Sequence, residues 1–456
     1  MLTVESFWSD FSKHHQSPEQ LDTPSNQEYL LAYSGGCDSH VLLHLLSELK
    51  RLNHISNIKA VHVNHQLHDD SNRWAAHCVQ QCENYSIPCD VINVNVDKNS
   101  GLGLEAAART ARYEALKTLI NKGQYLLTAQ HSDDQVETFL LQSLRGGGVK
   151  GLSSMPTIKP FSKGFLYRPL LHVSQINISE YAATNKLKWV DDPSNEDTEF
   201  DRNFLRKQII PVLKQRWPSL NKTFHRLTQH QAEAANLIDE LAEIDLALVQ
   251  ADENLISIEN LNTLSINRQK NVLRFWIENQ NKLTMPDSTH LMRILNEVVV
   301  AAEDSQPSVA WNDTVIRRFQ GKLYAEKKTN LRLLKTVKHW KPEQVYDLYA
   351  TEDNTSHGEQ LKTSETIGKG LSVTKLLNKN VSIRFRDGGE VCCPQGRGPH
   401  QHKLKKLLQE WEVPPWQRDS IPLVYVEDVL AQVVGYCICE PFAACSDEPA
   451  FQIVLT

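Results

Sequence analysis

The sequence has no apolar run approaching the roughly 18 residues of a membrane-spanning helix, and no basic leader followed by an apolar core at its start. Secretion and a membrane partner are therefore not expected. It has nine cysteines, an odd number, and no Cys-x-x-Cys pair, which argues against a disulfide framework. These absences predict a cytoplasmic protein.

An excess of positive charge is also missing, since 49 Lys and Arg against 55 Asp and Glu give a formal net charge of -6. A uniformly basic coat for nucleic acid is excluded, so any RNA contact must come from local clusters. One cluster comprises Arg202, Arg206, Lys207, Lys214, Arg216, Lys222 and Arg226, and a second comprises Arg397, Lys403, Lys405 and Lys406. Solvated helix faces are the alternative interpretation of both clusters.

Length and hydrophobic patterning predict an α/β protein of two to four domains. Strand-like runs at about 28–33, 58–63, 89–96 and 124–129 alternate with helix-like stretches at 39–54, 72–85, 104–121 and 134–144. This alternation predicts a Rossmann-like parallel sheet with helices on both faces. Ligands of such sheets bind beyond the carboxyl ends of the strands, where Ser34, residues 62–65 and residues 131–134 are expected to meet.

The remainder of the chain predicts a small, mostly helical domain and a C-terminal α+β domain. A helix-like stretch from 202 to 214 ends at Trp217-Pro218, because the residue before a proline disfavours helix. Residues 351–370 are rich in Thr, Ser, Glu and Gly and are interpreted as a linker or exposed loop. The predicted domains are 1–217, 218–330 and 375–456, with 331–374 as connecting segment and linker.

The segment Ser34-Gly35-Gly36-Cys37-Asp38-Ser39 lies between an apolar strand-like run and an apolar helix-like run. Two glycines let the backbone turn sharply toward an anion, and the helix that follows presents free N–H groups and a positive dipole end. A phosphate-binding loop is therefore predicted. It is neither a Walker A loop nor a dinucleotide fingerprint, because the Gly-Lys-Ser/Thr and the third glycine are missing. An ordinary turn with a helix cap is the structural alternative.

The form Ser-Gly-Gly-x-Asp-Ser resembles the pyrophosphate loop of ATP pyrophosphatases, which cleave ATP between the α and β phosphates and transfer AMP to a substrate oxygen. Further segments are similar to tRNA(Ile)-lysidine synthetases and follow in the same order. They are 105–113, 128–138 with 144–148, 189–195 and 202–206, and similarity continues at 386–390, 403–408 and 413–416. The chain is identified as a member of this family over nearly its whole length, although Gln130 stands where a second histidine is common.

The resemblance implies ligation of L-lysine to the wobble cytidine of the CAU anticodon of tRNA(Ile) through an adenylated cytidine, with ATP and Mg²⁺ as cofactors. A homodimer is left open. The implied ATP-binding residues are Ser34, Gly35, Gly36, Cys37, Asp38, Ser39, His62, Arg109 and Arg112. The implied catalytic residues are Asp38, His131, Asp133, Asp134 and Glu137. The implied RNA-binding residues are Arg145, Lys150, Arg202, Asn203, Arg206, Arg397, Lys403, Lys405 and Lys406.

Charge supports part of this assignment for the nucleotide. A carboxylate beside phosphates needs a cation, so Asp38 is the predicted magnesium ligand, although it can also cap its helix. Arg109 and Arg112 lie on one stripe of a predicted helix and can grip phosphates bidentately. A purely structural role on that helix is the alternative.

Three carboxylates, from Asp133, Asp134 and Glu137, crowd one predicted helix N-terminus beside His131. Like charges this close are costly unless a cation joins them. The helix dipole and capping explain one or two of them, whereas a metal ion or the ammonium of lysine explains all three. Lysine must lose a proton before it attacks, and the sequence leaves open whether a carboxylate or His131 accepts it.

Two rival functions have less support. A small-metabolite ligase with the same loop has no use for the later segments, and a non-catalytic RNA-binding module has no use for an intact loop. Sulfur transfer, for which tRNA thiolases of this loop class use paired cysteines, is disfavoured by the missing Cys-x-x-Cys. Cys78 and Cys82 are interpreted as buried, and Cys392, Cys393, Cys437 and Cys439 receive no role.

Overall fold

The computed structural model describes residues 1–13, 27–97, 103–191, 197–302, 305–328, 332–333, 340–341, 344–347, 349–350, 360–398 and 400–455. These residues form two compact units, Met1–Leu241 and Ala242–Thr456, which are considered separately. Among the described residues, no helix is both long and apolar enough to cross a membrane.

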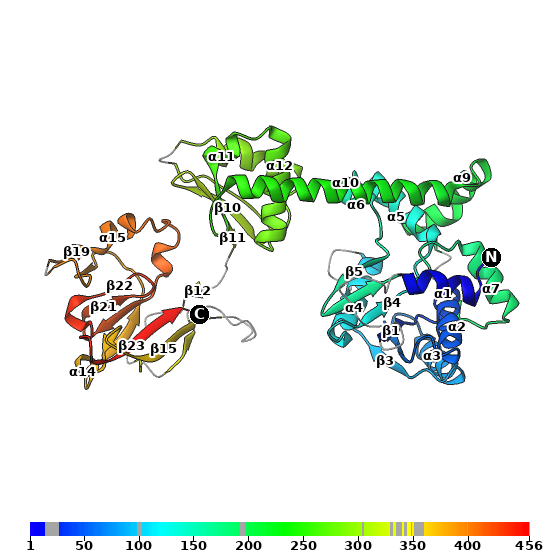
Figure 1. Ribbon diagram of the computed structural model, residues 1–456, viewed down its shortest axis with the longest axis horizontal. Helices are drawn as coiled ribbons and strands as arrows, with labels where there is room; N and C mark the ends of the chain where they lie inside the picture. The colour runs from blue at the N-terminus through cyan, green and yellow to red at the C-terminus, as the bar shows by residue number, and fades with distance from the viewer. Residues whose placement is uncertain are drawn as a thin grey trace. The chain divides into compact units, whose positions relative to one another are not determined.

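The first unit contains a six-stranded sheet in the order β3-β2-β1-β4-β6-β5 (Figure 1). Its strands are β1 (Glu28–Ala32), β2 (Asn57–Asn64), β3 (Cys89–Asn93), β4 (Tyr125–Leu127), β5 (Ile158–Phe161) and β6 (Gly164–Tyr167). All neighbours pair in parallel except β5 and β6, which form a hairpin. The predicted parallel sheet is confirmed, and the hairpin extends it by two strands beyond the predicted four.

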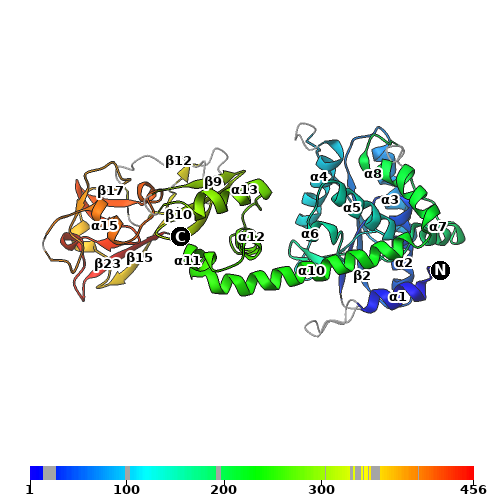
Figure 2. The same cartoon turned by 90° about the horizontal axis from the view of Figure 1, so that it is seen from above.

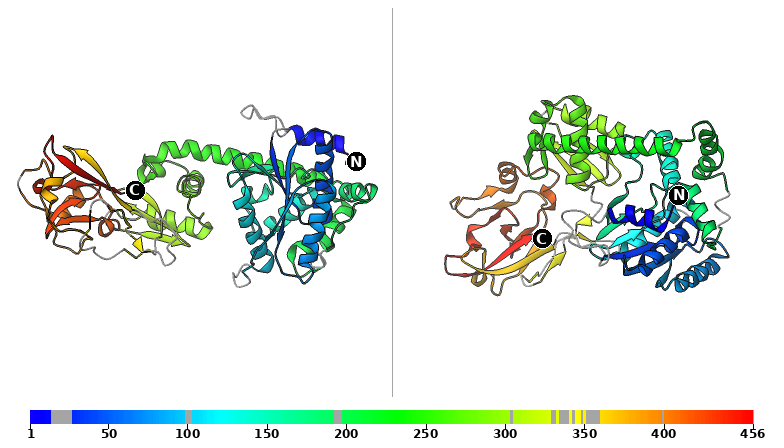
Figure 3. Two further views of the ribbon diagram at one scale, coloured as in Figure 1. Left: turned by 90° about the horizontal axis from the view of Figure 1, so that it is seen from below. Right: turned by 45° about the vertical axis from the view of Figure 1, so that its right-hand side comes forward.

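Helices cover both faces of this sheet, as predicted. They are α1 (Val4–Lys13), α2 (Cys37–Arg51), α3 (Ser71–Asn84), α4 (Leu104–Leu119), α5 (Ser132–Leu144), α6 (Val149–Leu152) and α7 (Gln175–Thr184). Side chains alternate along β1, so Tyr29 and Leu31 join a core with α1, α2, α3 and α7, whereas Leu30 joins a second core with α4. The sheet therefore lies between two helical layers (Figure 3, left). Cys78 and Cys82 are fully buried in the first core.

Strand β1 lies between β2 and β4, and it is parallel to both. The chain runs from β1 outward through β2 to β3 and then returns to add β4 on the other side of β1. This reversal creates a topological switch point at the carboxyl ends of β1 and β4, the place where such sheets bind ligands. The loop that begins at Ser34 follows β1, and His131 follows β4.

After the sheet, α8 (Asp201–Phe204), a π-helical turn η2 (Leu205–Ile209) and α9 (Ile210–Arg216) follow one another directly. Pro211 lies in the first turn of α9 and has no N–H to donate, which accounts for the widened turn before it. The segment ends at Trp217, before Pro218. The 30-residue α10 (Leu220–Val249) follows and contains the residues where the two units meet in sequence (Figure 2).

The second unit begins with a helical and β-sheet region around one core. Its helices are α11 (Ile258–Asn262), α12 (Ile266–Phe275), η3 (Trp276–Gln280), α13 (Ser288–Arg293) and η4 (Ile294–Val299). The sequence analysis did not predict the accompanying five-stranded sheet, β7-β8-β11-β10-β9. Its strands are β7 (Gln250–Asp252), β8 (Leu255–Ser257), β9 (Ser308–Trp311), β10 (Thr314–Phe319) and β11 (Lys322–Lys327). Gln320 and Gly321 both have positive φ, as the tight β10–β11 turn requires.

The C-terminal part is α+β, as predicted, with two four-stranded sheets, β13-β15-β23-β16 and β17-β20-β21-β22, and the pairs β12-β14 and β18-β19. Strands in it are β12 (Arg332–Leu333), β13 (Tyr346–Asp347), β14 (Tyr349–Ala350), β15 (Gln360–Ile367), β16 (Leu371–Ser372), β17 (Val381–Arg384), β18 (Val391–Cys392), β19 (His402–Lys403), β20 (Leu423–Val426), β21 (Val429–Val433), β22 (Cys437–Ile438) and β23 (Pro449–Leu455). Helices in it are α14 (Val373–Leu376), α15 (Leu404–Glu410), η5 (Arg418–Ser420) and η6 (Glu440–Phe442).

One interpretation of this region is corrected. Residues 360–367 are not an exposed loop but the strand β15, which pairs with β23 from Leu361 to Ile367. Its polar composition misleads because backbone hydrogen bonds to β23, together with the fully buried Leu361, hold the strand. Residues 351–359 of the predicted linker lie outside the described residues.

Candidate active site

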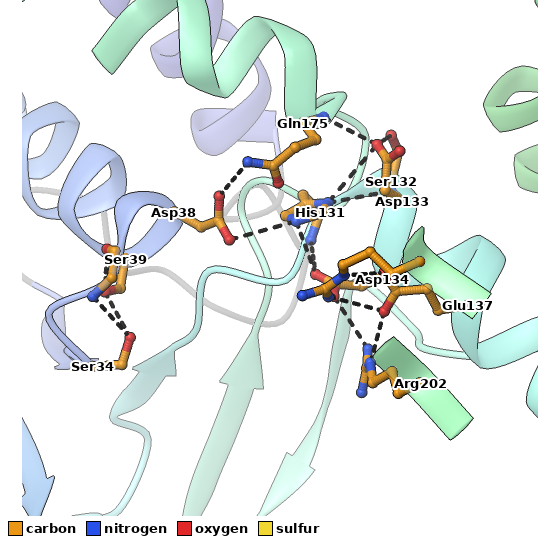
Figure 4. Close-up of polar contacts among 12 residues, drawn as sticks. Ser34, Asp38, Ser39, His131, Ser132, Asp133, Asp134, Glu137, Gln175 and Arg202 are labelled. Carbon is orange, nitrogen blue, oxygen red and sulfur yellow. Dashed lines mark hydrogen bonds and ion pairs between the residues drawn. The ribbon is translucent and has the colours of Figure 1, made fainter. Parts of the chain in front are cut away.

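The loop between β1 and α2 is held closed by its own side chains. Ser39 Oγ donates to the carbonyl oxygen of Gly36 over 3.0 Å, and the hydroxyls of Ser34 and Ser39 are 2.9 Å apart (Figure 4). Helix α2 begins at Cys37, two residues earlier than predicted, and its N-cap Gly36 has no side chain to cap the first turn. The first N–H groups of α2 are therefore left for an anion.

Of the two glycines in this loop, only Gly35 occupies a position that requires glycine. Its φ is +88°, and a Cβ on Gly35 would lie 2.8 Å from Cys78 Sγ. A Cβ on Gly36, whose φ is -75°, would only touch Ser34 Oγ at 3.7 Å. We therefore expect Gly35→Ala to destabilise the first unit by about 1–3 kcal/mol through backbone strain and the clash.

Thermal unfolding of the full chain, followed for the transition of the first unit, measures this effect. Gly36→Ala is the matched control and should leave the midpoint almost unchanged. Equal losses in the two variants would contradict the strain at Gly35.

Asp38 and His131 meet across the switch point. Asp38 Oδ1 accepts a hydrogen bond from Gln175 Nε2 at 3.0 Å, and its Oδ2 lies 3.6 Å from His131 Nε2 (Figure 4). Asp38 lies in the first turn of α2, whose N-cap is Gly36. Its side chain is 36% exposed, which leaves the carboxylate open to a ligand.

His131 is the N-cap of α5 and is almost fully buried, at 3% exposure. Its Nδ1 accepts from the Asp133 amide over 3.2 Å, and the His131 amide donates to Asp134 Oδ2 over 2.9 Å. An Nδ1 that accepts fixes the ring proton on Nε2. That nitrogen is 3.4 Å from Asp134 Oδ2, so it faces two carboxylates.

These contacts shift the pKa values of both His131 and Asp38. Burial alone would lower the pKa of His131, but the carboxylates of Asp134 and Asp38 raise the pKa above its usual value. Burial alone would raise the pKa of Asp38, but His131 and Gln175 hold the pKa of that carboxyl below its usual value. Asp38 is therefore held as the anion, and it faces the Nε2–H of His131, whose Nδ1 remains the acceptor for the Asp133 amide.

The acidic cluster is neutralised within the chain. Glu137, only 1% exposed, accepts from Arg202 Nε at 2.7 Å and from Arg206 Nε at 2.6 Å. Both arginines also reach Asp134 Oδ1 at 3.2 Å. Neither a metal ion nor a lysine substrate is needed to explain these two carboxylates, because two guanidinium groups already join them.

The third carboxylate has different partners. Asp133 Oδ1 pairs with Lys214, while its Oδ2 accepts from the Gln175 amide at 3.0 Å and from Asn221 Nδ2 at 2.8 Å. Gln175 thus bonds both Asp38, from the loop signature, and Asp133, from the second signature. The sequence reasoning missed Gln175 and Asn221. The only local signal was Ser174, the N-cap of α7, which predicts a helix start but no contact with either aspartate.

Two adjoining cavities open at this edge of the sheet, with volumes of about 660 and 370 Å³. The residues that line both are Ala32, Ser34, Gly36, Arg109, Arg112, Val190, Arg202 and Arg206. His62 and Asn203 line the larger cavity, whereas Cys37, Asp38, Ser39, Asp134 and Gln175 line the smaller one. Four arginines and the phosphate-type loop therefore share one space, which suits a polyanion such as a nucleoside triphosphate.

The predicted nucleotide residues thus lie together, with Gly35 in the loop backbone. The Val190 amide donates to the Gly35 carbonyl oxygen over 3.0 Å, so the segment around 189–191 packs on the loop. Residues 192–195 of that segment lie outside the described residues. His62 Nδ1 donates to the Tyr33 carbonyl oxygen over 3.0 Å, and burial lowers the pKa of His62, which keeps the ring neutral.

The structure locates the predicted RNA-binding residues in three places. Arg202 and Arg206 line the cavities and pair with buried carboxylates, and Asn203 beside them donates to the Asp197 carbonyl oxygen. Arg145 and Lys150 lie nearby in the first unit, where Lys150 pairs with Asp239 at 3.0 Å. The others belong to the second unit, where Arg397 pairs with Glu410 at 2.5 Å and Lys403, Lys405 and Lys406 are exposed.

Comparison with known proteins identifies the family. Residues 10–213 match a PP-loop domain, 256–324 a TilS substrate binding domain and 381–455 a TilS substrate C-terminal domain. A tRNA(Ile)-lysidine synthase from Coxiella burnetii (strain RSA 493 / Nine Mile phase I) is 42% identical over 93% of this chain and 92% of its own. The chain belongs to the tRNA(Ile)-lysidine synthase family.

Two further members of the family support this assignment. The synthase of Pectobacterium atrosepticum is 40% identical over 93% of this chain and 94% of its own. The synthase of Legionella pneumophila (strain Paris) is 36% identical over 94% of this chain and 95% of its own. The predicted family, the ATP-using ligase and lysidine formation on tRNA(Ile) are confirmed.

Proposed function

We propose that this chain ligates L-lysine to the wobble cytidine of the CAU anticodon of tRNA(Ile), with conversion of ATP to AMP and pyrophosphate. The observation that carries the proposal is the space at the switch point, where the Ser34–Ser39 loop meets four arginines, together with Asp38, whose carboxylate lies beside His131. The coverage of three family domains supports the substrate.

The proposed reaction has two steps. The oxygen of the cytidine base attacks the α-phosphorus of ATP, and the bond between the α-phosphorus and the bridging oxygen breaks to release pyrophosphate. The side-chain amine of lysine then attacks the base carbon that carries the adenylated oxygen, and the carbon–oxygen bond breaks to release AMP. The amine loses a proton in the second step.

The arginines supply the charge that pyrophosphate needs as it leaves. Arg109 and Arg112 of α4 line the shared space, and so do Arg202 of α8 and Arg206 of η2. Glu137 accepts from both of the latter two, so we assign Glu137 a positioning role rather than the predicted contact with lysine. Fixed guanidinium groups stabilise developing phosphate charge without reorganisation.

Asp38 fits the predicted magnesium ion. It offers one half-exposed carboxylate at the edge of the smaller cavity, and magnesium prefers one or two carboxylates together with phosphate oxygens. When bound, the ion neutralises triphosphate charge. Independently of the ion, Asp38 faces the Nε2 proton of His131, and we propose that the Asp38 carboxylate accepts the proton that the lysine amine loses. Asp133 is already paired with Lys214.

The remaining assignments follow from the tRNA substrate. We propose that Arg145 and Lys150 in the first unit, and Arg397, Lys403, Lys405 and Lys406 in the second, contact RNA phosphates. A tRNA substrate also favours the cytoplasm. The domain bounds 1–217, 218–330 and 375–456 stay predictions, as does a homodimer, which light scattering of the purified chain can test.

Replacing Lys403, Lys405 and Lys406 together by alanine is expected to raise the apparent KM for tRNA. Each lost phosphate contact lowers the slope of log affinity against log salt by about 0.7–0.9, so the slope should fall by up to about two to three units. ATP binding should be unchanged because the phosphate loop lies in the other unit. Initial rates at varied tRNA concentration give the KM for tRNA. Filter binding of tRNA at several salt concentrations gives the affinity and its salt slope.

An equal loss of charge elsewhere provides the control. Lys341, Lys362 and Lys369 are also exposed lysines of the second unit, and their triple alanine variant should keep the salt slope of the wild type. Identical slopes in both triple variants would make the lysines at 403–406 a solvated surface only.

Incorporation of radiolabelled lysine into bulk tRNA, followed by nucleoside analysis, tests the proposed function directly. We expect label in lysidine only when ATP, tRNA and the enzyme are all present. Label in a small metabolite without tRNA would instead support the rival metabolite ligase.

A further inference from the structure

Three cysteines of the C-terminal sheet converge on one point. The sulfur atoms of Cys392, Cys437 and Cys439 all lie within 4.8 Å of one another. Cys392 and Cys439 are 3% and 1% exposed, and Cys437 is half-buried. All the cysteines of the chain are free thiols.

The backbone fixes this convergence. Cys392 ends β18, Cys437 begins β22, and Cys439 directly follows β22 as the N-cap of η6. The segments are bonded to each other, because the Gln395 amide donates to the Ile438 carbonyl oxygen at 2.9 Å and the Glu440 amide donates to the Cys393 carbonyl oxygen at 2.7 Å. Because the segments are adjacent and hydrogen-bonded through their backbones, the fold itself holds the three thiols together.

A fourth possible ligand lies on the strand paired with β18. His402 of β19 is the register partner of Cys392 of β18, so the two residues stand side by side in the hairpin. Its Nε2 is buried and, among the described residues, has no hydrogen-bond partner. A buried ring nitrogen without a partner is costly unless it binds something.

We propose that Cys392, Cys437, Cys439 and His402 form a structural zinc site. Three sulfurs and one imidazole are a common donor set for structural zinc, and a zinc–sulfur distance of about 2.3 Å places tetrahedral sulfurs about 3.8 Å apart. The sulfur spacing within 4.8 Å is compatible with this geometry after a small adjustment. The His402 ring lies outside that group of three and would have to rotate toward the sulfurs on binding. A packed cluster of reduced thiols would not account for the partnerless His402 nitrogen.

The site has a structural consequence. It joins the β18–β19 hairpin to β22, and β19 leads directly into α15. The ion would therefore anchor the start of the helix that carries Lys405 and Lys406. Each thiol loses its proton on binding, so zinc uptake releases protons to solvent and involves no oxidation or reduction.

The test is metal analysis of the full chain, purified under reducing conditions without an affinity tag or chelator. We expect about one zinc ion per chain that survives dialysis. Cys437→Ser should reduce zinc to background, and His402→Ala should weaken retention against a competing chelator by about tenfold or more. Cys445→Ser removes an exposed cysteine of the same region and should retain full zinc.

A second measurement covers the case in which Cys437→Ser misfolds. Wild-type chain loaded with Co²⁺ should show the intense sulfur-to-cobalt absorption of tetrahedral thiolate coordination, and zinc should protect these cysteines from alkylation. Zinc at background both after purification and after zinc addition would overturn the proposal, as would a disulfide between two of the three sulfurs in the freshly purified protein. Both readouts are independent of lysidine formation.

Discussion

Asp38→Asn is expected to abolish lysidine formation while the chain remains folded. Asparagine keeps the shape of the side chain and an oxygen that can accept from Gln175 Nε2, so no packing is lost. It removes the negative charge that faces His131 Nε2 and that we assign to magnesium. Loss of several kcal/mol of charge stabilisation predicts a decrease in kcat/KM of more than about a hundredfold.

Asp90→Asn is the matched control. Asp90 is a half-exposed residue of β3 that pairs with Lys59, outside both cavities, and its replacement should leave lysidine formation unchanged. The unfolding midpoints of both variants should stay close to that of the wild type. Near-normal activity of Asp38→Asn with an unaltered magnesium requirement would remove the metal role of Asp38.

Hydrophobic periodicity was enough to predict the parallel sheet and its binding edge. In β1, Leu30 lies on one face of the sheet and Tyr29 and Leu31 lie on the other. Such alternation is a local pattern, so it can be recognised in the sequence. Because parallel strands share a carboxyl end, the residues after each strand were expected to meet, and Ser34 after β1 and His131 after β4 do lie at that edge.

The partners within the site could not be predicted in the same way. Glu137 is separated from Arg202 by 65 residues and from Arg206 by 69, and no periodicity links segments so far apart. Charge alone suggested opposite roles, an external cation for the acidic group and RNA for the basic group. The fold instead brings the two groups together, because buried carboxylates are stable only when paired.

The role of Gln175 illustrates the same limit at a single residue. An amide side chain carries no charge and no motif, yet Gln175 bonds Asp38 through its side chain and Asp133 through its backbone. The convergence of Cys392 with Cys437 and Cys439 likewise depends on the pairing of segments distant in sequence. Such contacts follow from the tertiary pairing of elements that the sequence predicts only one at a time.

The order of the chemical steps determines when pyrophosphate is released. If the cytidine is adenylated first, pyrophosphate should appear with ATP and tRNA before lysine is added, up to about one equivalent per enzyme when the intermediate is retained. An amine is already a nucleophile and needs no activation, whereas the oxygen of the base must be converted into a leaving group. Exchange of labelled pyrophosphate into ATP with lysine alone should therefore be absent.

Two controls make this result specific to the proposed site. Asp38→Asn should release no pyrophosphate with ATP and tRNA, because its phosphate environment lacks the required charge, whereas Asp90→Asn should behave as the wild type. A tRNA with a different anticodon should not support release. Lysine added after the burst should then yield AMP in the same amount as the pyrophosphate already formed, since the amine displaces AMP from the adenylated base. Robust exchange from ATP and lysine without tRNA would reverse the assignment, because lysine and not cytidine would then carry the adenylate.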